Sequence, residues 1–176
     1  MIFEETGLNG AYVIVPERLP DARGYFARTF CAAEFQRMGL VTTLVQCSVS
    51  FNPRRGTWRG MHYQVAPFEE AKLVRCTRGA AWDVIADLRR DSPTYRQHLA
   101  LELSAENGRL LYVPPQFAHG FVTLADDTEV SYQMSACYSS EHARGFRWND
   151  PAFGIELPVP VNVISERDRN YADFET

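Results

Sequence analysis

The 176-residue sequence lacks the features that mark several large classes of protein. No apolar run approaches the ~20 residues of a membrane span, and the start, Met-Ile-Phe-Glu-Glu, has acids where a signal peptide carries bases. The four cysteines are scattered and form no Cys-x-x-Cys pair, which argues against a disulfide or zinc framework. A net charge of only −4 gives no general affinity for nucleic acid. We therefore expect a cytoplasmic protein with reduced thiols that binds neither membranes nor nucleic acid.

The composition is that of an ordinary globular protein. Apolar residues make up 45% of the chain and charged residues 23%, and no repeat, linker or low-complexity segment interrupts it. The length is sufficient for one domain with a full core and short for two. We expect a single domain over residues 1–176.

Short extended segments, separated by turns rich in Gly, Pro and Asn, dominate the pattern. The predicted strands cover residues 11–15, 43–51, 57–64, 71–77, 80–88, 99–103, 109–113, 120–124 and 129–136. Residues 31–38 have helix composition and end at a glycine, whereas residues 19–24 are predicted to form a turn. The tail after Pro151 is expected to wrap around the barrel. Many short strands favour an all-β fold, best a double-sheet jelly roll that leaves a cavity between its sheets.

Two segments resemble the two-part signature of the cupin superfamily of small barrels. Gly56 precedes a histidine by six residues, and Gly108 precedes Pro114 by six, with a second histidine five residues later. Metal-binding cupins supply three His and one Glu from this pattern. The corresponding positions here are His62, Gln64, Lys72 and His119. Because an ammonium cannot ligate a cation, and two His with one amide make a poor metal site, we expect no metal and no other cofactor.

A cation-rich polar row remains on the predicted inner face, where Arg59 joins these positions. Buried polar groups need a polar ligand or solvent, so we expect this row to line a site. A lone histidine in a strand is more often a core residue, but His62 stands with Lys72 and other polar groups. An imidazole, with an unperturbed pKa of roughly 6.5, suits a general base, and an ammonium stabilises an enolate oxygen. Together they could remove a proton next to a carbonyl, with Asp168 the best candidate to orient the base.

The sequence resembles the dTDP-4-dehydrorhamnose 3,5-epimerase family over almost its whole length. The motifs that carry the resemblance are Asp-x-Arg23-Gly-Tyr-Phe, Arg59-Gly-Met-His62-Tyr-Gln, Ala-Lys72-Leu-Val-Arg-Cys, Asp83-Val-Ile-Ala-Asp87-Leu-Arg, Phe117-Ala-His119-Gly-Phe, Val-Ser-Tyr132, Trp148-Asn-Asp-Pro and Ser-Glu-Arg-Asp168. The resemblance implies a metal-independent jelly-roll cupin that acts on a nucleotide sugar and forms a homodimer by exchanging N-terminal strands.

The resemblance also implies roles for individual residues. His62, assisted by Asp168, would remove the proton α to the C4 ketone, Lys72 would stabilise the enolate, and Tyr132 would return a proton from the opposite face. The implied substrate-binding residues are Arg23, Phe26, Arg28, Gln46, Ser48, Arg59, His119, Tyr138 and Arg167. Among them, Arg59 suits the diphosphate, Tyr138 would stack on the nucleobase, and Arg23 and Phe26 would reach the nucleoside from the partner subunit.

Several positions depart from the family pattern, most of them where the nucleotide is bound. Arg28 stands where the family usually has Glu, Gln46-Cys47-Ser48 replaces Gln-Asp-Asn or Gln-Ser-Asn, Trp58 replaces Leu, Ala143 replaces Glu, and Arg167 replaces Lys. The catalytic set is complete and the recognition set is altered, so we expect the chemistry to be kept, whereas the identity of the nucleotide and of the exact sugar stays open.

The prediction is an epimerase that inverts C3, C5 or both in a nucleotide-linked (dTDP or other) 4-keto-6-deoxyhexose of deoxysugar biosynthesis. Two alternatives stay open. A 3,4-ketoisomerase on the same scaffold needs the same first proton abstraction, and a non-catalytic sugar-nucleotide-binding cupin needs none.

Overall fold

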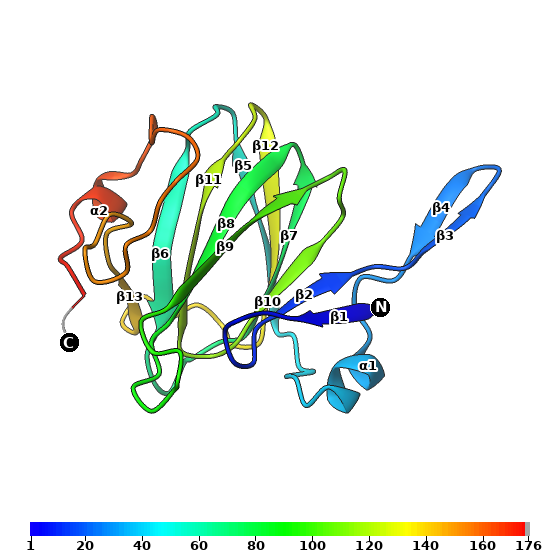
Figure 1. Cartoon of the computed structure of the whole chain (residues 1–176), viewed down its shortest axis with the longest axis horizontal. Coiled ribbons are helices and arrows are strands. Elements are labelled where there is room, and N and C mark those ends of the chain that lie inside the picture. The colour runs from blue at the N-terminus through cyan, green and yellow to red at the C-terminus, as the bar shows by residue number, and fades with distance from the viewer. Residues whose placement is uncertain (175–176) are drawn as a thin grey trace.

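The computed structural model describes residues 1–174, in which two antiparallel sheets face each other (Figure 1). The six-stranded sheet has the order β1 (Ile2–Glu5), β2 (Tyr12–Val15), β10 (Leu110–Val113), β7 (Lys72–Arg78), β12 (Thr128–Met134) and β5 (Gln46–Asn52). The five-stranded sheet has the order β13 (Ala143–Gly145), β6 (Trp58–Gln64), β11 (Phe117–Thr123), β8 (Ala80–Asp87) and β9 (His98–Ser104). This arrangement confirms the predicted all-β, cupin-type jelly roll.

Every predicted strand and the predicted helix are present, with ends that differ by at most three residues. The helix, α1 (Ala32–Arg37), is followed by Gly39 with φ 69°, a left-handed conformation that glycine adopts at little cost. Strands β1 and β13 and the short helix α2 (Glu166–Arg169) were not predicted. The last two residues of the expected domain, 175 and 176, lie outside the described part.

The prediction of a simple turn over residues 19–24 was wrong. β3 (Arg18–Asp21) and β4 (Gly24–Ala27) pair antiparallel as a separate hairpin, which projects away from both sheets (Figure 1). Pro20 and Asp21 disfavour strands in general, but proline is tolerated on an edge strand, and all four residues of β3 are exposed. The turn chemistry is therefore confined to the tip of the hairpin.

Three apolar clusters hold the sheets and the C-terminal segment together. One lies between the sheets and includes Val74, Ile85 and Phe121. A second joins the outer face of the five-stranded sheet to the chain after residue 145, where Phe146 and Phe153 stack with ring centroids 4.4 Å apart. A third lies beneath α1. The C-terminal segment thus packs along the barrel, as predicted, and it brings α2 beside β6 (Figure 1).

The cysteines and the two helices can be compared with the expectations from the sequence. All four cysteines are free. Neither helix of residues 1–174 is long and apolar enough to cross a membrane.

Candidate active site

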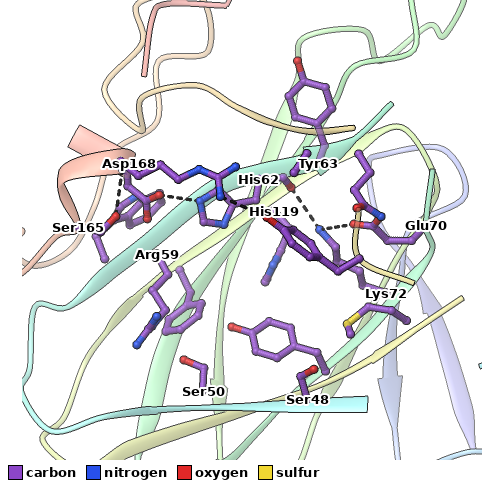
Figure 2. Close-up of a pocket in the computed structure, with 18 of the residues that line it drawn as sticks. Ser48, Ser50, Arg59, His62, Tyr63, Glu70, Lys72, His119, Ser165 and Asp168 are labelled. Atoms are coloured by element: carbon purple, nitrogen blue, oxygen red, sulfur yellow. Dashed lines mark hydrogen bonds and ion pairs between the residues drawn. The ribbon is translucent and has the colours of Figure 1, made fainter. Parts of the chain in front are cut away.

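A cavity of about 780 Å³ opens between the two sheets. β5, β7 and β12 line it from the six-stranded sheet, β6 and β11 line it from the five-stranded sheet, and the segment around α2 borders it (Figure 2). Its size is typical of small-molecule sites. The predicted polar row of Arg59, His62, Gln64 and Lys72 does line this cavity, together with His119 and Tyr132.

A bulge in β6 places Arg59 and His62 on the same side of the sheet. Across the ladder with β11, His62 pairs with His119, whereas Arg59 pairs with Phe121, so three residue steps in β6 match two in β11. Strict alternation would put positions 59 and 62 on opposite faces, and one extra residue reverses that relation. Arg59 is then held by a hydrogen bond from its Nε to Oδ1 of Asn52, 2.7 Å long.

His62 is paired with Asp168, although 106 residues separate them in the sequence. The Nε2 atom of His62 lies 2.8 Å from Oδ1 of Asp168, which is buried (Figure 2). The helix α2 fixes this carboxylate, since Ser165 caps the helix by accepting the backbone N–H of Asp168 at 3.0 Å. The backbone N–H of Gly60 donates to the other carboxylate oxygen at 3.3 Å.

These contacts determine the ionisation of Asp168. Burial acts to raise its pKa, but the hydrogen bonds from His62, Gly60 and Ser165 outweigh burial, and the pKa lies below its ordinary value. The ionised carboxylate accepts the proton on Nε2 of His62. The other ring nitrogen, Nδ1, is then the one left to accept a proton from a ligand.

Lys72 enters the cavity from the six-stranded sheet and is ion-paired with a residue that the sequence analysis missed. Its Nζ lies 3.1 Å from Oε1 of Glu70 and donates to the backbone oxygen of His62 at 3.2 Å (Figure 2). Both side chains are almost fully buried, with 10% and 7% exposed. The only signal for Glu70 was its proximity in the chain, because it lies two residues before Lys72 and just outside β7.

Tyr132 stands on β12, in the sheet opposite the one that carries His62. Burial raises the pKa of its phenol, so the hydroxyl keeps its proton at neutral pH and can donate it. Ser50 on β5 acts to lower this pKa, but burial outweighs it.

A second histidine–aspartate pair forms the wall beside the first. His119 Nε2 lies 3.0 Å from both carboxylate oxygens of Asp83 on β8, and both residues are buried. His119 was expected to lie along the substrate, and Asp83 was not predicted as its partner. Its ring packs edge-on against Tyr132, with centroids 5.9 Å apart.

The outer part of the cavity brings together other predicted substrate-binding residues. Gln46 and Ser48 line it from β5. The Oε1 atom of Gln46 accepts the backbone N–H of Tyr138 at 2.9 Å, and Arg167 donates to the Tyr138 hydroxyl at 3.4 Å. The exposed Tyr138 ring and the guanidinium of Arg167 thus form one polar and aromatic patch at the mouth.

Three predicted substrate-binding residues lie outside this chain's own cavity. Arg23 and Phe26 are on the projecting hairpin, where Arg23 pairs with Asp21 at 2.6 Å and Phe26 is 67% exposed. Arg28 pairs with Glu34 of α1 at 3.1 Å.

The described side chains that line the cavity do not form a metal site. Within residues 1–174, no group of three or more His, Cys, Asp or Glu side chains could hold a metal ion. At the position where a cupin carries a ligand, Lys72 offers an ammonium already paired with Glu70.

Comparison with known proteins gives consistent matches over the whole chain. A family model described as dTDP-4-dehydrorhamnose 3,5-epimerase matches residues 5–176. A dTDP-4-dehydrorhamnose 3,5-epimerase of Sinorhizobium fredii is 46% identical over 169 residues, which cover 96% of this chain and 87% of that protein.

Solved structures with the same description share the fold. The enzyme of Bacillus anthracis, crystallised with TDP and PPi bound, superposes with a TM-score of 0.94 at 38% identity, covering 98% of this chain and 99% of that one. The enzyme of Elizabethkingia anophelis gives a TM-score of 0.96 at 37% identity, covering 99% and 96%.

Proposed function

This chain belongs to the dTDP-4-dehydrorhamnose 3,5-epimerase family, and on that premise we propose that it epimerises a dTDP-linked 4-keto-6-deoxyhexose in deoxysugar biosynthesis. The expected reaction inverts both carbons next to the C4 ketone, C3 and C5, without a metal or another cofactor. The observation that carries the proposal is the cavity between the sheets, which has a histidine–aspartate pair on one wall and a protonated tyrosine on the other.

The first step is removal of a proton α to the ketone. His62 accepts this proton on Nδ1, and the electron pair of the C–H bond moves into the new C=C bond as the C4 oxygen becomes negative. Asp168 stabilises the imidazolium that forms, and it keeps the ring in the tautomer that can accept the proton.

Lys72 is the group that stabilises the enolate oxygen. Its ammonium is itself largely shielded from water, where a donor contributes more to stabilising a developing negative charge than in solution. Removing one such donor from an enzyme costs roughly 10²–10³ in kcat.

Tyr132 completes the inversion. Its phenol donates a proton to the opposite face of the carbon, the C=C electron pair forms the new C–H bond, and the C4 ketone is restored. The phenolate then regains a proton and the imidazolium loses one through solvent, so each inversion brings one solvent hydrogen into the sugar. Tyr132 and His62 come from facing sheets, which supports delivery from opposite sides.

The mouth of the cavity is suited to the nucleotide. The guanidinium groups of Arg59 and Arg167 can bind phosphate oxygens through paired donors, and the exposed Tyr138 ring can stack on a base. Gln46, Ser48 and His119 supply further hydrogen-bonding groups along the cavity.

We propose that the active form is a cytoplasmic homodimer. The projecting hairpin supports this proposal, because Leu19, Tyr25 and Phe26 are large apolar side chains that it leaves exposed. Exposed apolar clusters mark interaction sites. In a homodimer, the hairpin of one protomer would bring Arg23 and Phe26 to the nucleoside bound by its partner.

The proposal is tested by NMR of the sugar protons during incubation in D₂O with dTDP-4-keto-6-deoxyglucose, and in parallel with the CDP-linked sugar. We expect deuterium at C3 and C5 of the dTDP sugar and an inverted configuration. Exchange at C3 alone would indicate a C3 epimerase, and a product with the ketone at C3 would indicate a ketoisomerase. Measurable binding with no deuterium uptake from either sugar would establish a passive binder and refute the proposal. Faster turnover of the CDP-linked sugar than of the dTDP-linked sugar would contradict the assignment of dTDP as the nucleotide.

A further inference from the structure

Lys72 is the only lysine among the 18 lysine and arginine residues of the chain. It is also the cation that the cavity surrounds most closely, since its side chain is 10% exposed. Burial disfavours an ammonium, because the charged form loses its hydration. A residue that must be charged to stabilise an enolate therefore needs a compensating group of its own.

Glu70 is placed to be that group. One carboxylate oxygen, Oε1, lies 3.1 Å from Nζ of Lys72, and the other, Oε2, accepts a short hydrogen bond from the side-chain amide of Gln64. The amide of Gln64 is fixed in turn, because it donates to the backbone oxygen of Phe68 at 2.9 Å and accepts the N–H of Ser139 at 2.6 Å. The carboxylate of Glu70 thus has little freedom to move away from Lys72.

The geometry around Nζ leaves one donor for a ligand. An ammonium has three N–H groups. The Glu70 carboxylate takes one and the backbone oxygen of His62 takes another, and no third acceptor from residues 1–174 is in contact. Because Lys72 lines the cavity, the remaining N–H is available to an oxygen bound there.

We infer that Glu70 is a positioning residue for the reaction: it keeps Lys72 charged inside the cavity and directs the free N–H of the ammonium toward the C4 oxygen of the sugar. This inference rests on the proposed function for its substrate, and Gln64 supports it by holding Glu70 in place.

The surroundings of Lys72 contain few other groups that could replace Glu70. Its neighbours across the ladders are Val113 on β10 and Met134 on β12, both uncharged. The other ionisable groups that line the cavity are His62 with Asp168, His119, the tyrosines Tyr63, Tyr132 and Tyr138, and the arginines Arg59, Arg144 and Arg167. The ion pair with Glu70 is the only one that Lys72 makes within residues 1–174.

The single lysine allows a direct test that needs no substrate. Protein labelled with ¹³C,¹⁵N-lysine gives one side-chain signal, that of Lys72, and its titration midpoint can be followed by NMR in the wild type and in Glu70→Gln. We expect the midpoint to lie lower in Glu70→Gln than in the wild type, because the buried ammonium loses its counter-charge. Glu69→Gln is the matched control, since Glu69 carries the same charge one residue away and contacts Gln116 instead.

The second readout is kinetic and links the charge to catalysis. In Glu70→Gln we expect kcat to fall about tenfold to a hundredfold with a much smaller change in KM, and the alkaline limb of the kcat–pH profile to move to lower pH with the NMR midpoint. A purely structural role for Glu70 would lower the melting temperature and leave the midpoint unmoved.

An unmoved midpoint in Glu70→Gln, or an equal shift in Glu69→Gln, would overturn the inference. If Glu70→Gln does not fold, Glu70→Asp decides by the same criterion, because it withdraws the carboxylate by one methylene. If the wild type shows no deuterium exchange, the proposed function fails, and the lysine titration still decides whether Glu70 holds Lys72 charged.

Discussion

The cavity contains two histidine–aspartate pairs in adjacent strands, and only one of them is open. His62 and His119 are direct neighbours across the β6–β11 ladder, and each contacts its carboxylate through Nε2. The His62 side chain is 42% exposed, whereas that of His119 is 5% exposed. A base must reach its substrate and then pass its proton to solvent. The two pairs consist of the same chemical groups and differ in how accessible the imidazole is to substrate and solvent. The more accessible histidine, His62, is therefore the better candidate for the base.

The carboxylates differ in the same way. Asp83 lies within 3.0 Å of His119 through both of its oxygens in a fully buried position, which immobilises the pair as part of the wall. Asp168 divides its oxygens between His62 and the backbone of Gly60, so it orients the ring from one side only.

Replacing each histidine in turn by asparagine is expected to give the largest difference in the rate of deuterium exchange. His62→Asn should slow deuterium exchange at saturating substrate by about 10²–10⁴, since it removes the general base. His119→Asn should mainly raise KM and keep the exchange rate at saturation within about tenfold of the wild type. The measurement is the exchange rate by NMR, and equal losses in both variants would remove the distinction between the pairs.

Tyr132→Phe sharpens the contrast between the two walls of the cavity. The variant keeps the base on one wall and loses the acid on the other, so exchange should persist while inversion slows by about 10²-fold. Following the deuterium content and the configuration of the sugar in one reaction separates these steps. Simultaneous loss of both would contradict an acid on the opposite face.

Replacing the two aspartates should have different consequences, one for catalysis and the other for stability. Asp168→Asn should lower kcat by about tenfold to a hundredfold, because it no longer orients and stabilises the protonated ring. Asp83→Asn should instead lower the free energy of unfolding by about 1–3 kcal/mol, since it disturbs a buried hydrogen-bonded group. Urea unfolding measured beside kcat distinguishes the two, and a larger kcat loss in Asp83→Asn would reverse our assignment.

The smallest effect is expected on the hairpin, where Leu19 and Phe26 are largely exposed. Phe26→Ala should raise KM by about tenfold and leave kcat unchanged, because a lost stacking contact with a nucleoside costs about 1–3 kcal/mol. Steady-state kinetics provide the values. A normal KM in a protein shown to be dimeric by light scattering would contradict a role for this hairpin in the partner's site.

Local pattern predicted much of this molecule. Short apolar runs and turn residues were sufficient for the strands, and the polar row drew attention to His62 and Lys72, whereas the role of Tyr132 came from the family resemblance. Glu70 was missed because it lies just before β7, outside the predicted strand over residues 71–77, and carries the opposite charge to the cationic row.

The pairings across the fold could not be predicted in that way. Asp168 reaches His62 only because the C-terminal segment packs along the five-stranded sheet, and Asp83 meets His119 through strand order. Such contacts depend on tertiary packing, which the periodic pattern of apolar and polar residues within a single segment does not reveal. Asp168 was named as a candidate partner of His62 before the fold was known, but neither the contact between Asp83 and His119 nor the pairing of β3 with β4 was predicted.

The most direct test of the central claim is a crystal structure of His62→Asn with dTDP-4-keto-6-deoxyglucose bound. We expect the side chain of residue 62 to face a carbon next to C4 at about 3–3.5 Å, a near-attack distance, with the Tyr132 hydroxyl on the other face of the sugar. A sugar whose α carbons face His119, or a ring with residues 62 and 132 on the same side, would contradict it.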